Sequence, residues 1–201
     1  MTMRALLYTP PTGEPVSLES LKLHLRIELD VTDEDEYLEG LIVSAREEVE
    51  HITRRAIMTQ TWDYYLEDWP NRNHIVLPFG NLQSVPLTQY IEYTDSDGDS
   101  TTLTPTTEYL WETNGEGFGR IVLPYAGTWP SGSLYPSNPI TIRFVCGWTT
   151  AALVPFQIKA AIKMICAELY EGRGEAQLGM TVHENKTYER LLASYKLWGN
   201  F

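Results

Sequence analysis

The sequence predicts an α+β protein in which a small helical bundle carries an inserted antiparallel β region. Apolar residues recur at helical spacing near both ends of the chain, and between about residues 59 and 146 they alternate with the two-residue period of strands. We therefore expect four helices near residues 17–28, 34–55, 155–171 and 187–198. The helical segments lie on both sides of the β region, so they can form one bundle.

The length and composition fit a single domain with an N-terminal extension. A chain of 201 residues with 43% hydrophobic content can bury one sizeable core. Residues 1–16 contain several prolines and read as an extended arm. Residues 17–201 are expected to form one domain, with a helical core of residues 17–57 plus 153–201 and a β insertion of residues 58–152.

A capping residue and an acidic run predict where the first two helices begin. Ser17 is a candidate N-cap for a helix whose apolar face is Leu18, Leu21 and Leu25. The acidic run at residues 30–36 places negative charge at the start of the second helix, where the helix dipole favours it. The apolar face of that helix comprises Tyr37, Leu38, Leu41, Ile42, Ala45, Val49 and Ile52.

Seven short strands are expected in the β region, at residues 61–67, 74–79, 84–93, 100–103, 109–112, 119–123 and 140–145. The segment DSDGD at residues 95–99 resembles part of a calcium loop, but it lacks the closing glutamate and flanking helices. An Asp-Gly pair between alternating segments is a hairpin signal, so a hairpin is the favoured interpretation.

The helix at residues 155–171 has the clearest pattern in the chain. Its apolar face comprises Ile158, Ala161, Ile162, Ile165, Cys166, Leu169 and Tyr170. Pro155 suits a first helical position, and Gly172 can adopt the left-handed conformation that ends a helix.

Residues 172–185 are glycine-rich and have neither the helical nor the strand period of apolar residues. This composition indicates a loop or an arm that orders on contact with a partner.

Charge and motif content argue against several functions. The net charge is −12 and no cluster of Lys and Arg forms a basic face, which disfavours tight binding of nucleic acid. The four histidines are dispersed, the two cysteines are not spaced as a metal or redox pair, and no nucleophile motif is present. No window approaches the roughly 18 uninterrupted apolar residues that a membrane helix requires, and the N-terminus lacks the apolar core of a signal peptide. We expect no enzyme activity, cofactor or metal site.

Candidate interface residues come from the aromatic β region and the glycine-rich segment. Core packing accounts for most of the aromatic residues there, and a contact patch for another protein is the alternative. Trp129 and Tyr135 lie in a Pro-rich loop, where exposure is most expected. The candidate interface residues are Arg173, Gln177, Met180, Trp129 and Tyr135.

The order of these signals resembles the phage head-tail connector (adaptor) family, in the groups labelled phiE125 gp8-like and gp6-like. The segments that carry the resemblance are PVSLESLKLHLRI, ITRRAIMTQTWDYYLEDWP, LPFGNLQSV, GRIVLPYAGTWP, ITIRFVCGW and VPFQIKAAIKMICAELYEGR. It covers approximately residues 15–173. The segment 174–201 does not match the pattern, so its role is not implied.

The resemblance implies a structural adaptor of a tailed bacteriophage. Such a protein forms a cyclic homo-oligomer below the portal, with about twelve copies by symmetry matching, and docks a stopper or tail-completion protein. DNA passes through the channel without specific binding, which an acidic wall favours. The implied location is the neck of the virion, after assembly in the host cytoplasm. The alternatives are a tail or virion β-protein that binds a carbohydrate or host protein, and a hydrolase.

Overall fold

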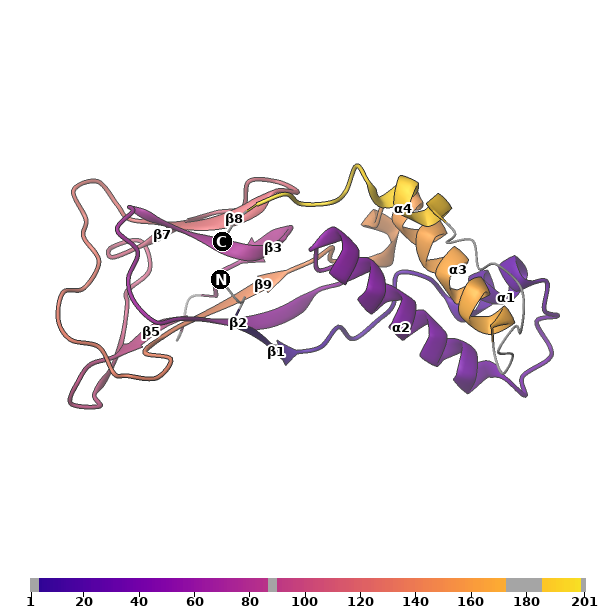
Figure 1. The fold of residues 1–201 in the computed structure, drawn as a ribbon, viewed down its shortest axis with the longest axis horizontal. Coiled ribbons are helices and arrows are strands. Elements are labelled where there is room, and N and C mark those ends of the chain that lie inside the picture. Colours follow the sequence, from indigo (N-terminus) through magenta and orange to yellow (C-terminus); the bar gives the residue numbers. More distant parts are fainter. Residues whose placement is uncertain (1–3, 87–89, 173–185, 200–201) are drawn as a thin grey trace, which may run out of the picture. The chain divides into compact units, whose positions relative to one another are not determined.

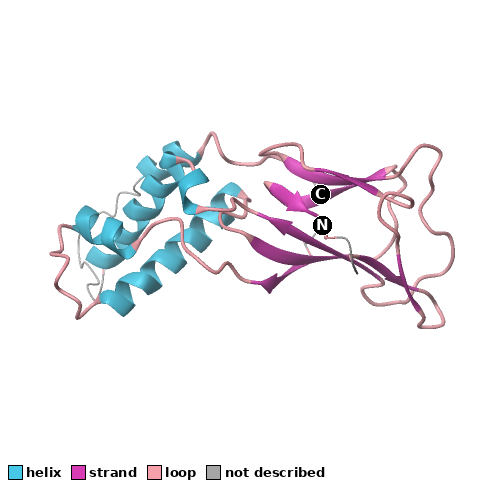
Figure 2. Cartoon of the chain, turned by 180° about the vertical axis from the view of Figure 1, so that it is seen from behind, coloured by secondary structure: helices cyan, strands magenta, loops and turns pink. Residues whose placement is uncertain are grey.

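The computed structural model describes residues 4–86, 90–172 and 186–199, and it confirms the α+β class. The chain divides into two compact units (Figures 1 and 2). The helical unit comprises residues 12–58 and 148–196, and the sheet unit comprises residues 1–11, 59–147 and 197–201. The boundary between β1 and the helices that follow falls between Pro11 and Thr12.

The helical unit contains the four expected helices and one short 3₁₀ turn. They are α1 (Leu18–Leu25), α2 (Asp35–Thr53), η1 (Ala151–Leu153), α3 (Phe156–Glu171) and α4 (Lys186–Leu192). The Ser17 hydroxyl accepts a hydrogen bond from the Ser20 amide at 3.2 Å, which confirms the predicted N-cap of α1. The acidic residues Asp35 and Glu36 occupy the first turn of α2, as expected.

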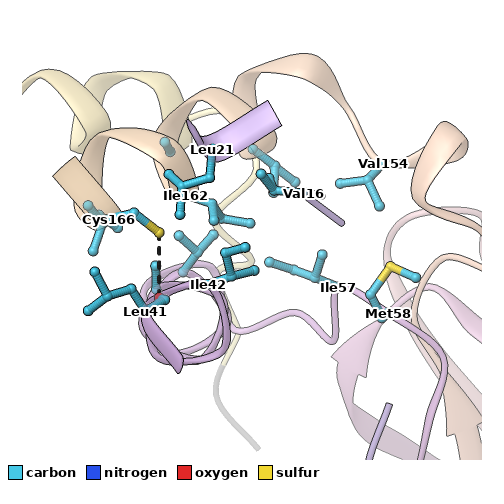
Figure 3. Packing of buried hydrophobic residues seen from close by; sticks show 14 of the residues in the cluster. Val16, Leu21, Leu41, Ile42, Ile57, Met58, Val154, Ile162 and Cys166 are labelled. Atoms are coloured by element: carbon cyan, nitrogen blue, oxygen red, sulfur yellow. Dashed lines mark hydrogen bonds between the residues drawn. The ribbon is translucent and has the colours of Figure 1, made fainter. Parts of the chain in front are cut away.

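The core of this unit is apolar and is built mainly between α2 and α3 (Figure 3). Leu21, Leu38, Ala45 and Ile162 are completely buried. The Cys166 thiol donates a hydrogen bond to the Leu41 carbonyl at 3.5 Å, so it is satisfied without a second cysteine. Most of the residues on the periodic faces pack in this core, but Tyr37 on α2 and Leu169 on α3, which were predicted on those faces, are 36% and 40% exposed.

Three helix ends differ from expectation. Pro155 precedes the first helical residue, with an extended backbone at ψ 143, and so serves as the N-cap of α3. Gly172 has φ −74 and ψ 0, so α3 ends without a left-handed residue, and the Gly172 amide bonds to the Glu168 carbonyl. The last helix ends at Leu192, well before residue 198, because a turn from Leu192 to Tyr195 closes it.

The described residues of the sheet unit form nine strands in two antiparallel sheets. The larger sheet has the order β1-β2-β9-β5-β6 with β4 also on β9, and the smaller has the order β3-β8-β7. The strands are β1 (Ala5–Thr9), β2 (Gln60–Leu66), β3 (His74–Gly80), β4 (Leu82–Ser84), β5 (Ile91–Thr94), β6 (Ser100–Thr102), β7 (Leu110–Glu112), β8 (Phe118–Val122) and β9 (Ile140–Cys146).

The two sheets pack against each other through their apolar faces. The rings of Trp62 on β2 and Phe79 on β3 are 4.3 Å apart. Gly119 on β8 approaches Leu82 on β4 so closely that a Cβ at this glycine would meet the leucine side chain at 2.3 Å. Alternate residues of β9 are buried, among them the fully buried Phe144. The unit is thus a two-layer sandwich, as its short alternating strands require.

Two strand predictions need correction. The expected strand at residues 84–93 is two strands, β4 and β5, and residues 87–89 between them lie outside the described part of the chain. Pro86 interrupts the segment because proline has no N–H for a strand ladder. Residues 5–9 of the expected extended arm are extended, and they pair with β2 as the edge strand β1.

Candidate functional site

The structure describes two of the five predicted interface residues, Trp129 and Tyr135. Arg173, Gln177 and Met180 lie outside the described residues. Tyr135 is 45% exposed, and its amide donates to the Thr94 carbonyl at 3.0 Å, which ties its loop to strand β5. Of the proposed set, Tyr135 is the residue that the structure places on the surface.

Trp129 is half-buried, which corrects the expected exposure. Its indole N–H donates to the Arg72 carbonyl at 2.7 Å, and its ring stacks on Trp69 at 5.0 Å with an interplanar angle of 7°. Trp69 makes an edge contact with Tyr93 at 5.9 Å. Trp129 therefore fastens the Pro-rich loop to the sheet unit, because both its polar atom and its ring face already have partners.

The acidic turn between β5 and β6 is the predicted hairpin. The Asp95 carboxylate accepts hydrogen bonds from the amides of Asp97 and Asp99 at 2.9 and 3.0 Å, and Gly98 has φ 90. Asp95 is thus used to stabilise the turn. Among the residues that the structure describes, no group of three or more His, Cys, Asp or Glu could hold a metal ion.

The exposed side of α2 in the helical unit is acidic. Glu36, Glu39, Glu47 and Glu48 are exposed there. Arg46, the one Arg or Lys of this helix, is 4% exposed, and its guanidinium binds Glu14 at 2.9 Å and Glu50 at 2.8 Å. Burial raises the pKa of the Glu14 carboxyl, and Arg46 counteracts that rise. An acidic surface of this kind repels nucleic acid.

The outer face of the larger sheet carries an ion pair that is covered by a tyrosine ring. Asp63 on β2 lies directly opposite Arg143 on β9, and the two side chains form paired hydrogen bonds of 2.6 and 2.7 Å. The Tyr8 ring of β1 covers the Arg143 guanidinium at 3.4 Å. The hydrogen bond to Asp63 raises the pKa of Arg143, and burial opposes that rise. This contact joins three strands.

Strand β1 presents apolar side chains at the edge of the sheet. Leu6, Leu7 and Tyr8 are 63%, 45% and 57% exposed. At its start, the Arg4 guanidinium pairs with Glu67 at 2.7 Å, and the Arg4 carbonyl accepts from the Tyr65 amide. This edge strand was not predicted from the sequence. The apolar run ALLYT before two prolines is the signal that could have revealed it.

The described residues thus form an α+β protein of two compact units. Both cysteines are buried thiols, and burial raises the pKa of Cys166 to about 12, which keeps it protonated and unreactive at neutral pH. No helix within the described ranges is long and apolar enough to cross a membrane.

Comparison with known proteins finds a family model that matches part of the chain. Residues 15–102 match the model described as the phage gp6-like head-tail connector protein family. The match confirms, for this part of the chain, the resemblance to head-tail connectors found in the sequence. No curated protein matches the chain.

Solved structures share the whole fold. The chain resembles a protein in the "neck of empty GTA particle computed with C6 symmetry", with a TM-score of 0.79, 18% identity, and 99% and 98% of the two chains covered. It also resembles a protein in the virion of a native gene transfer agent (GTA) particle, with a TM-score of 0.77, 17% identity, and 99% and 98% covered. A third, from the neck of the native particle with C12 symmetry, has a TM-score of 0.74, 16% identity, and 100% and 98% covered.

Proposed function

We propose that this protein is a structural head-tail connector of a phage-like particle. The observation that carries the proposal is the agreement of two independent comparisons. Residues 15–102, which include α1, α2 and the strands β2–β6, match the connector family model. Over nearly its full length, the chain has the fold of proteins from particle necks. The role is structural rather than catalytic, and the two units act together as one connector domain.

The proposal extends to how the protein assembles and which partners it binds in the particle. Neck structures with C6 and C12 symmetry support a ring, and a dodecamer below a portal protein is the arrangement that we propose. A stopper or tail-completion protein would bind the opposite side of the ring. DNA would pass without being held, as the net charge of −12 and the acidic side of α2 favour. The ring would lie in the virion neck after assembly in the host cytoplasm.

The proposal is tested by measuring mass in solution. The purified protein is examined by light scattering alone, and then mixed with the portal protein of the same particle. A ring, or a monomer that joins the portal at ring stoichiometry, is expected. A protein that stays small and does not bind the portal would overturn the proposal and would direct attention to carbohydrate or host-protein binding by the sheet unit.

A further inference from the structure

Strand β1 is attached to the sheet by few but specific contacts. None of its five residues is buried, and four of them are exposed. It is held by the ladder to β2, by the Arg4–Glu67 ion pair and by the Tyr8 ring over Arg143. Because β1 contributes nothing to the core, removing it from its place costs less than removing any central strand. Its contacts are nevertheless selective, since they require the β2 and β9 residues of this chain.

A short hinge connects β1 to the helical unit. After Thr9 the chain runs through Pro10 and Pro11, and Thr12 and Gly13 are exposed. Glu14 is fixed to Arg46 on α2, so the hinge comprises residues 10–13. Proline favours an extended segment, which spans about 12 Å over four residues. The boundary between the two units falls inside this hinge, so β1 belongs by packing to one unit and is joined by the chain to the other.

We propose that β1 is exchanged between neighbouring copies in the assembled ring, so that β1 of one subunit pairs with β2 of the next. This inference rests on the proposed connector function. The occupant is a second copy of this chain, because only another copy offers Glu67, Arg143 and the β2 ladder in the same arrangement. Exchange forms no new kind of contact, and short, constrained hinges favour it. Neighbours held in a ring supply the high effective concentration that exchange needs.

The exchange links neighbouring subunits of the ring through a noncovalently paired strand. Each helical unit would be joined through residues 10–13 to a strand inserted in the next sheet unit. The β2 edge would be covered in both states, by its own β1 in the monomer and by a neighbour's in the ring. Covering matters because an open edge strand invites unwanted pairing.

A double cysteine variant distinguishes the two pairings. Thr9 and Thr61 are paired across β1 and β2, and both natural cysteines are buried. The variant Thr9→Cys/Thr61→Cys is oxidised as dilute monomer and as assembled ring, and then separated on a denaturing gel without reductant. We expect an internal disulfide in the monomer and covalent multimers from the ring. The single variants Thr9→Cys and Thr61→Cys serve as controls and should give no ladder of multimers.

Each other outcome has a separate meaning. A ring that yields only internally linked monomers overturns the exchange while the connector function stands. The absence of a disulfide in both states would refute the β1–β2 pairing on which the inference depends. Failure to form any ring, seen by light scattering of the unsubstituted protein with the portal, overturns the proposed function itself.

Discussion

The carboxylate of Asp63 and the guanidinium of Arg143 form paired hydrogen bonds of 2.6 and 2.7 Å across β2 and β9. The Asp63 side chain is 10% exposed, whereas the Arg143 side chain is 28% exposed. Bidentate geometry makes this a strong pair, and its partial burial limits the screening of the charges by water.

Removing one partner of this pair should destabilise the fold. We expect Asp63→Ala to lower the free energy of unfolding by about 1–3 kcal/mol, less than for a fully buried pair because Arg143 retains some water contact. Urea denaturation measures this change. The control is Glu112→Ala, which breaks the Glu112–Arg120 pair, whose side chains are 44% and 41% exposed, and should cost under about 1 kcal/mol. Equal losses of unfolding free energy in the two variants would show that the Asp63–Arg143 pair stabilises the fold no more than the exposed Glu112–Arg120 pair does.

A charge at the centre of the helical core should prevent folding. Ile162 on α3 is completely buried, so Ile162→Asp places a carboxylate in apolar surroundings at a cost of about 4 kcal/mol or more. That loss is comparable to the whole stability of a small domain. The same change at Leu169, which is 40% exposed on the same helix, should be tolerated. A soluble Ile162→Asp protein with cooperative melting would contradict the packing of α3.

Gly40 should limit the stability of α2. It lies inside the helix, and a Cβ added there would have nothing within 4 Å. Gly40→Ala should therefore raise the free energy of unfolding by about 0.5–1 kcal/mol, because alanine loses less backbone freedom on folding. The contrasting variant is Gly119→Ala, where the new methyl group would collide with Leu82. Stabilisation by both changes, measured by thermal melting, would disprove the close sheet packing.

Stability should fall at alkaline pH through Cys166. Burial raises the pKa of this thiol from 9.0 to about 12 in the folded protein. Between these values the unfolded chain loses the proton while the folded chain keeps it, so the free energy of unfolding decreases as pH rises from about 9 to 12. The urea midpoint measured across this range should decline less steeply in Cys166→Ala. If the urea midpoint of Cys166→Ala declines with pH as steeply as that of the unsubstituted protein, the thiol is not shielded from water in the folded protein.

The periodic helices and the hairpin were predictable because local patterns determine them. The faces of α2 and α3 follow from the 3.6-residue spacing of their apolar residues, and Ser17 follows from the chemistry of helix caps. The family resemblance also came from the sequence and is confirmed over residues 15–102. Two predictions were wrong. The last helix ends at Leu192 because a turn follows it, and the single strand predicted at residues 84–93 is two strands because a proline interrupts it.

The fold class, most elements and the acidic character of this protein could be predicted from the amino-acid sequence. The pairing of β1 with β2, the contact of Asp63 with Arg143 and the packing of Trp129 on Trp69 became visible in the folded chain. The β1–β2 partners are 52 to 59 residues apart in the sequence, the two tryptophans 60, and Asp63 and Arg143 80. No local periodicity specifies such pairs, because strand order and register are set by the packing of the whole sheet.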